Sequence, residues 1–188
     1  MTPESLKTPG GNTRRHVSAQ LNIASGLMVL QASALLFAAI GAGYAHFHID
    51  AAVNAAALES DVPVESYQIT WKAEYFHFQV RLTLWHACLF TPLLVGTGIW
   101  ARTGRRIARI AALVTTLFSV LCCFCSGFRL YAADEPVDGL DEALPAAFGQ
   151  VYPEWVDLAT VALTVSFFPA IVAAALIYNE LPPRQAAH

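Results

Sequence analysis

The fold is decided by residues 82–128: LTLWHACLFTPLLVGTGIWA (82–101), then RTGRRIAR (102–109), then IAALVTTLFSVLCCFCSGF (110–128). The first and third segments carry no charged side chain, and each has about 20 residues, the length of α-helix that crosses a hydrocarbon core. A helix is required because lipid offers exposed backbone groups no hydrogen-bond partner. The short link between the segments predicts an antiparallel pair of membrane-spanning helices.

Two further uncharged runs, residues 16–49 and 158–179, are also long enough to span a bilayer. Only 13% of the residues are charged, against about 25% in a soluble domain. We therefore predict an all-α fold, an integral membrane four-helix bundle, with Pro92 and Pro169 kinking two of its helices. The expected helices cover about 21–46, 73–101, 107–131 and 156–179; they lie within a transmembrane domain, 16–180, that a disordered tail (1–15) and a short tail (181–188) flank.

The distribution of positive charge predicts the orientation of these helices. One side of the expected bundle carries Lys7, Arg14, Arg15, Arg102, Arg105, Arg106, Arg109 and Arg184. By the positive-inside rule this side is cytoplasmic, which places both termini inside and two acidic loops outside. Arginine and alanine are abundant and lysine is scarce, a bias typical of GC-rich bacteria, so the expected location is a bacterial cytoplasmic (inner) membrane.

The outer loops contain two candidate helices. The alanine-rich residues 50–58 could continue the first span beyond the membrane. Residues 141–148 lie between two prolines and could form a short interfacial helix.

The outer half of the second span carries a charged stripe. At 100° per residue, one face is shared by Glu74, His77, Arg81, Trp85, Cys88 and Pro92. Ionisable side chains inside a membrane usually face other helices or a wet cavity, so Arg81 and Glu74 are candidates for an intramembrane charge site. The alternative is that Arg81 extends outward to the lipid headgroups or pairs with an acidic residue of a loop.

Three histidines are predicted near the outer interface: His46, His48 and His77. Together with neighbouring carboxylates they are candidate ligands for Zn or Cu(II). However, His46 and His48 diverge by about 160° on a helix, so both can bind one metal only where the helix is frayed. The alternative is that these are ordinary interfacial histidines.

The cysteines suggest a second chemistry. Cys122 and Cys125 form a CxxC in the third span, and Cys88 lies at a similar depth in the second. Four-span thiol oxidoreductases of the disulfide-forming and vitamin-K-epoxide-reductase types resemble this arrangement. The chain departs from their pattern because neither outer loop contains a cysteine. Cys88, Cys122 and Cys125 are therefore candidate redox thiols, or else small apolar side chains in the helix packing.

No motif for nucleotide binding or a catalytic triad is present, and we expect neither a cofactor nor a nucleic-acid partner. Gln31 is predicted to hydrogen-bond across the bundle, as polar residues in spans often do. The favoured function is a non-enzymatic accessory or structural subunit that packs with other membrane subunits or with copies of itself in the lipid bilayer; an enzymatic role is left open. The alternatives are a membrane redox or metal-handling protein and a small oligomeric transporter or channel.

Overall fold

The computed structural model describes the backbone of residues 18–60, 63, 66–132 and 139–181, and the side chains of these residues except 123–132. The described chain is helical throughout, with short turns. Its helices are α1 (Ala19–His46), α2 (Ile49–Glu59), α3 (Tyr67–Ala101), α4 (Arg106–Ala132), α5 (Leu140–Val151), α6 (Glu154–Val165) and α7 (Phe167–Asn179).

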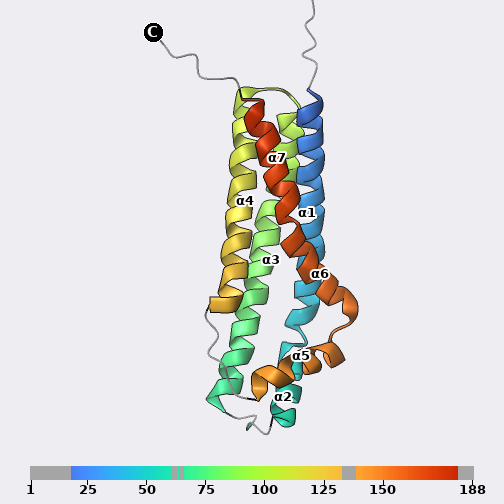
Figure 1. Ribbon diagram of the computed structural model, residues 1–188, viewed down its shortest axis with the longest axis vertical. Helices are drawn as coiled ribbons and strands as arrows, with labels where there is room; N and C mark the ends of the chain where they lie inside the picture. Colours follow the sequence, from blue (N-terminus) through green and yellow to red (C-terminus); the bar gives the residue numbers. More distant parts are fainter. Residues whose placement is uncertain (1–17, 61–62, 64–65, 133–138, 182–188) are drawn as a thin grey trace, which may run out of the picture.

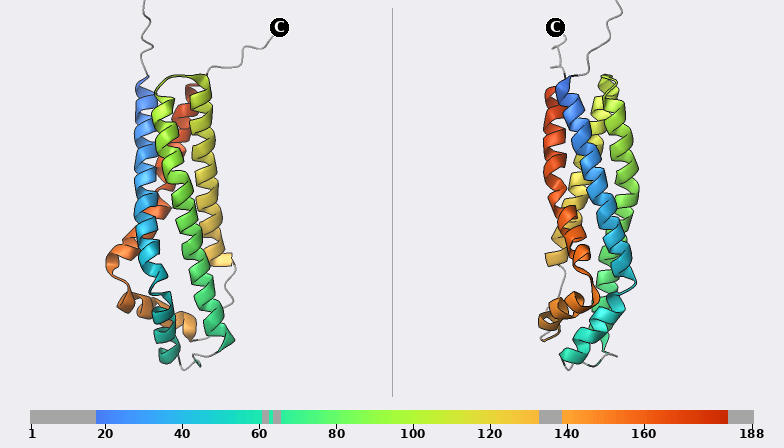
Figure 2. Two further views of the ribbon diagram at one scale, coloured as in Figure 1. Left: turned by 180° about the vertical axis from the view of Figure 1, so that it is seen from behind. Right: turned by 90° about the vertical axis from the view of Figure 1, so that its right-hand side faces the viewer.

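The long helices lie side by side along one axis (Figures 1 and 2). α1 packs against α3 on one side and against α6 and α7 on the other, and α4 completes the group between α3 and α7. The start of α1, the end of α7 and the α3–α4 turn lie at one end, which we call the link end. The short helices α2 and α5 lie at the opposite end, the cap end.

Among the residues that the structure describes, three segments are long and apolar enough to cross a membrane: Ala19–His46, Tyr67–Ala101 and Glu154–Asn179, the last comprising α6 and α7. The expectation of an all-helical chain with membrane-length apolar helices is confirmed by the described residues. The number of crossings and their direction stay predictions.

The second long helix begins earlier than the sequence suggested. α3 starts at Tyr67 rather than near residue 73, because the Ser66 hydroxyl accepts a hydrogen bond from the Ile69 amide at 3.4 Å and caps the helix. At about 1.5 Å per residue its 35 residues measure about 52 Å, well beyond the 30 Å of a hydrocarbon core. Pro92 lies inside this helix without ending it. At the link end, Gly104 takes a φ of 70°, a left-handed conformation suited to glycine, and turns the chain into α4.

Two breaks interrupt segments that the sequence suggested were continuous helices. α1 does not continue through residues 50–58 as one helix: it ends at His46, and α2 begins at Ile49. At this turn the Phe47 and His48 amides donate to the Tyr44 and Ala45 carbonyl oxygens, three residues back rather than four, and His48 Nδ1 lies 2.9 Å from the Tyr44 carbonyl oxygen. The second break, at Ser166, follows from Pro169, which has no N–H to offer the Val165 carbonyl.

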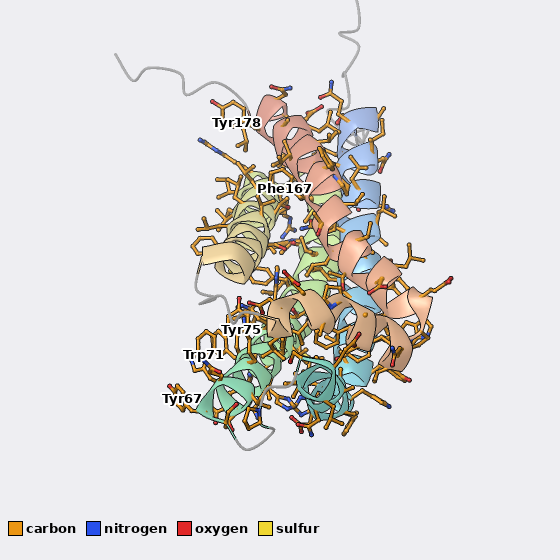
Figure 3. All side chains as sticks on the ribbon, turned by 60° about the horizontal axis from the view of Figure 1, so that its bottom comes forward. Tyr67, Trp71, Tyr75, Phe167 and Tyr178 are labelled. Carbon is orange, nitrogen blue, oxygen red and sulfur yellow. The ribbon has the colours of Figure 1, made fainter. Side chains whose placement is uncertain are left out.

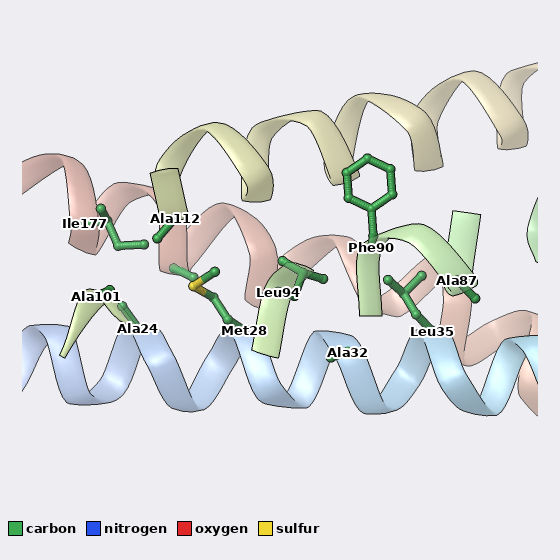
Figure 4. Packing of buried hydrophobic residues seen from close by; sticks show 11 residues of the cluster. Ala24, Met28, Ala32, Leu35, Ala87, Phe90, Leu94, Ala101, Ala112 and Ile177 are labelled. Carbon is green, nitrogen blue, oxygen red and sulfur yellow. The ribbon is translucent and has the colours of Figure 1, made fainter. Parts of the chain in front are cut away.

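Small apolar residues form the main core between the long helices (Figure 4). It is filled by Ala24, Met28, Ala32, Leu35, Ala87, Phe90, Leu94, Ala101, Ala112, Ala173 and Ile177. Alanine and glycine at such contacts let helix backbones approach closely. Gly41 is the clearest case, since a Cβ built on it would lie 2.6 Å from the Ala159 Cβ of α6.

A second core holds the cap end together. α2 packs against α5, and both cover the first turns of α3, where Tyr67, Trp71 and Tyr75 lie along the helix (Figure 3). Its buried residues are Ile49, Val53, Ala56, Ala57, Ile69, Leu140, Ala143, Leu144 and Ala147. Lys72 is fully buried beside this core and its Nζ lies 2.8 Å from Asp141 Oδ1, an ion pair that joins α3 to α5. We call α2, α5 and the first three turns of α3 the cap.

Candidate functional site

Two histidines and a carboxylate meet where the cap joins the long helices. His46 is the last residue of α1, Asp50 lies in the first turn of α2, and His77 comes from α3. The Nδ1 atoms of His77 and His46 are 3.1 Å apart, and His77 Nε2 lies 3.0 Å from Asp50 Oδ1. His77 therefore stands between the other two side chains, with both ring nitrogens engaged.

The carboxylate determines the protonation of this chain of groups. Asp50 can only accept, so His77 Nε2 carries the proton and donates it. In neutral His77 the Nδ1 atom is then an acceptor, which requires His46 to donate from its own Nδ1. His46 Nε2 is left with a lone pair. The three groups can thus relay a proton, or present imidazole nitrogens to a metal.

The third predicted ligand, His48, points elsewhere. Its ring stacks on Tyr44 at a centroid distance of 4.3 Å, and its Nδ1 donates to the Tyr44 carbonyl oxygen. Among the residues that the structure describes, no set of three or more His, Cys, Asp or Glu side chains is arranged to hold a metal ion. The structure therefore brings two of the three predicted ligands together and adds Asp50 as a hydrogen-bond partner of His77.

Tyr152, at the end of α5, borders the same site. Its hydroxyl donates to the Ala45 carbonyl oxygen at 3.3 Å, and its ring lies 6.5 Å from that of Tyr44. Burial, together with the negative charge of Asp50, raises the pKa of Tyr152 to about 12. The phenol is thus held in its neutral form beside the carboxylate.

A separate polar cluster lies between the long helices. Gln31 Nε2 donates to Ser119 Oγ at 3.0 Å, and His86 Nε2 lies 3.3 Å from the same oxygen. All three side chains are buried. The predicted cross-helix hydrogen bond of Gln31 is confirmed, and its partner is Ser119 of α4.

The predicted charged stripe of α3 faces away from the other helices. Glu74, Arg81, Trp85, Cys88 and Pro92 are all exposed, and Trp85 retains 75% of its surface. No ion pair joins Arg81 to a carboxylate in the described part of the chain. His77 is the member of the stripe that turns inward, because α1 and α2 meet beside it.

The two candidate redox thiols whose side chains the structure describes do not lie together. Cys88 is exposed on α3, whereas Cys122 of α4 is partly buried against the main core. The side chain of Cys125 lies outside the described residues, so the predicted CxxC pair is not described.

Sequence reasoning missed the Lys72–Asp141 pair, Ser119 and Tyr152. Lys72 offered a signal, since it stands among aromatic residues at a helix start, where an isolated lysine needs a carboxylate partner when buried. Ser119 and Tyr152 gave none, because serine and tyrosine are ordinary in such segments.

Comparison with known proteins adds no relative: no protein-family model matches the chain, and no curated protein or solved structure matches it significantly.

Proposed function

We propose that this protein is a non-enzymatic accessory subunit of a larger membrane complex. It crosses a bacterial inner membrane four times as a helical bundle, with both termini in the cytoplasm, and docks on its partner through the exposed face of α3. The observation that carries the proposal is Arg81, a permanent charge that the fold turns outward.

The position of Arg81 gives this observation its weight. It lies 20 residues before the end of α3 at Ala101, which is about 30 Å along the helix axis and about the thickness of a hydrocarbon core. Glu74 is two turns further out, about 10 Å away along the axis, beyond the reach of a direct ion pair. A carboxylate on a partner helix would pair with Arg81, and Trp85 and Cys88 below it would pack against that helix.

The arginines of the link end support the proposed orientation. Arg109 donates to the Glu180 and Gly104 carbonyl oxygens, and so holds the end of α7 to the α3–α4 turn. Arg105 and Arg106 are exposed and available to an anionic lipid surface. Positive charge gathered at the end where α1 begins and α7 ends favours a cytoplasmic location for that end.

Site-specific photocrosslinking in intact membranes tests the docking. A photoreactive phenylalanine analogue at Trp85 should give one discrete adduct with a second protein, and Arg81→Ala should weaken it several-fold. Arg81→Lys should restore it only in part, because an ammonium lacks the paired donors of the guanidinium. The matched control is Phe168, an exposed aromatic residue on α7, where the same analogue should give no discrete adduct.

Two results would contradict the proposal. One is an adduct of twice the mass of the 20.3 kDa chain, which would make the α3 face an interface between identical copies. The other is equal crosslinking from Trp85 with and without Arg81, which would return Arg81 to a role as a lipid anchor.

A second candidate function, metal handling, is favoured by one specific observation, the paired Nδ1 atoms of His46 and His77. The small-transporter alternative has less support, because the main core fills the link-end half of the described helices with apolar side chains.

A further inference from the structure

The imidazoles of His46 and His77 meet at an angle rather than end to end. Their ring centroids are 4.9 Å apart and their planes are inclined at 80°. A straight N–H···N bond with the observed 3.1 Å between nitrogens would hold the centroids about 5.4 Å apart. The shorter distance means that the in-plane directions of the two Nδ1 atoms, the N–H of His46 and the lone pair of His77, are bent off the line that joins the nitrogens.

This geometry is close to that of two ligands on one tetrahedral metal ion. With metal–nitrogen bonds of about 2.05 Å, two such ligands have nitrogens about 3.3 Å apart and ring centroids about 5.2 Å apart. The observed 3.1 Å and 4.9 Å are each shorter by about 0.3 Å or less. Opening the pair by that amount requires only small rotations of the two rings.

Asp50 gives His77 the hydrogen-bond partner that metal-binding histidines usually have. Metal-binding histidines usually donate their other ring N–H to a carboxylate, which fixes the tautomer and makes the ligating nitrogen more basic. His77 Nε2 donates to Asp50 Oδ1 at 3.0 Å, which leaves Nδ1 for the metal. The Asp50 side chain is 72% exposed and that of His77 is 20% exposed, so an ion can reach the site from solvent.

We propose that His46 Nδ1 and His77 Nδ1 bind one divalent first-row transition metal ion of the kind that prefers imidazole, Zn(II) or Cu(II), at the junction of α1, α2 and α3. Asp50 orients His77 and does not touch the metal. Two waters complete the coordination. On binding, the His46 proton moves from Nδ1 to Nε2. Both ligands are then neutral imidazoles, and the protein releases no proton. The site does not depend on the docking of α3 proposed above.

Isothermal titration of Zn²⁺ alone into the full chain, purified in detergent without a polyhistidine tag, tests the site. One Zn²⁺ per chain should bind at pH 7.5, and His46→Ala and His77→Ala should each weaken binding at least tenfold. Asp50→Ala should weaken it by about 10–100-fold. His48→Ala is the matched control, since His48 lies two residues from His46 yet stacks on Tyr44, and it should bind as the wild type does.

A second measurement covers variants that fold poorly. Cu²⁺ bound to the wild-type chain should give an electron paramagnetic resonance spectrum with nitrogen hyperfine splitting from two imidazoles. Wild-type binding no tighter than that of the His46→Ala/His77→Ala double variant would overturn the proposal. A spectrum that shows a single nitrogen ligand would overturn it as well.

Discussion

Removal of the Ser119 hydroxyl is the sharpest perturbation that the structure offers between the long helices. Ser119→Ala deletes one oxygen and leaves almost no cavity. That oxygen is the acceptor for Gln31 Nε2 and lies within hydrogen-bond distance of His86 Nε2. Gln31 is fully buried, and its Oε1 already has no hydrogen-bond partner in the described chain. The substitution therefore leaves a buried amide group without its cross-helix bond.

The expected cost follows from that single loss. A buried polar group deprived of its partner costs about 1–3 kcal/mol. Hydrogen bonds between membrane helices are worth less, about 0.6 kcal/mol on average and about 1.7 kcal/mol at most. Because the Gln31 side chain is fully buried, we expect a value in the upper part of the second range, about 1–1.7 kcal/mol.

Equilibrium unfolding in mixed micelles, followed by far-ultraviolet circular dichroism, measures this cost. Thr116→Val is the matched control: Thr116 is equally buried one turn away on α4, but its hydroxyl donates to the Ala112 carbonyl of its own helix. The control should change the free energy of unfolding by less than about 0.5 kcal/mol.

A double-mutant cycle with Gln31→Met separates the hydrogen bond from packing. Methionine keeps the length of the side chain and removes its polar atoms, so Ser119→Ala in that background should cost about 1 kcal/mol less than in the wild type. The reasoning is refuted if the two single costs simply add, or if Ser119→Ala costs no more than Thr116→Val.

Three further outcomes are expected. In a chain without its native cysteines, a cysteine at Thr103 should escape a membrane-impermeant maleimide in intact cells, whereas one at the exposed Gln150 should react; the reverse pattern would overturn the orientation. The absorbance difference between the wild type and Tyr152→Phe should titrate with a midpoint of about 12 rather than 10.0. Because the folded-state pKa is the higher one, the stabilisation from the neutral phenol is complete below pH 10 and is lost as the pH rises from 10 to 12, and a midpoint near 10 would refute this. Asp141→Ala should destabilise the cap more than Lys72→Met does, as measured by limited proteolysis. Asp141→Ala takes a contact from the Lys72 ammonium, which is 0% exposed. Lys72→Met instead leaves the Asp141 carboxylate, which is 33% exposed and can be reached by water. Equal effects would contradict the burial argument.

The long helices were predictable because their cause is local. Uncharged runs of about 20 residues and charged links between them are visible in the sequence without any knowledge of packing. The same reasoning placed α5 close to its observed bounds, since prolines mark both sides of that segment. It missed the early start of α3, because the Ser66 cap is a single residue and the segment before residue 73 is only moderately apolar.

The cap was less predictable because it depends on contacts between segments far apart in the chain. Its core joins residues of α2, α3 and α5. The buried Lys72 makes the point most clearly. Its aromatic neighbours in the sequence hint at burial, but only the packing of α5 over it shows that its partner is Asp141.

The histidine site shows how one local interruption decides a site. In one continuous helix, His46 and Asp50 would be four residues apart on the same face, close enough to interact with each other directly. The turn at Phe47 and His48 ends α1 and starts α2 in a new direction, and His77 of α3 then lies between the two side chains. The sequence pointed to His46 and His77 through their shared depth, but it could not show this turn, at which the Phe47 and His48 amides donate to the Tyr44 and Ala45 carbonyl oxygens three residues back. His48, the third predicted ligand, belongs to this turn, but its ring stacks on Tyr44 instead of joining His46 and His77.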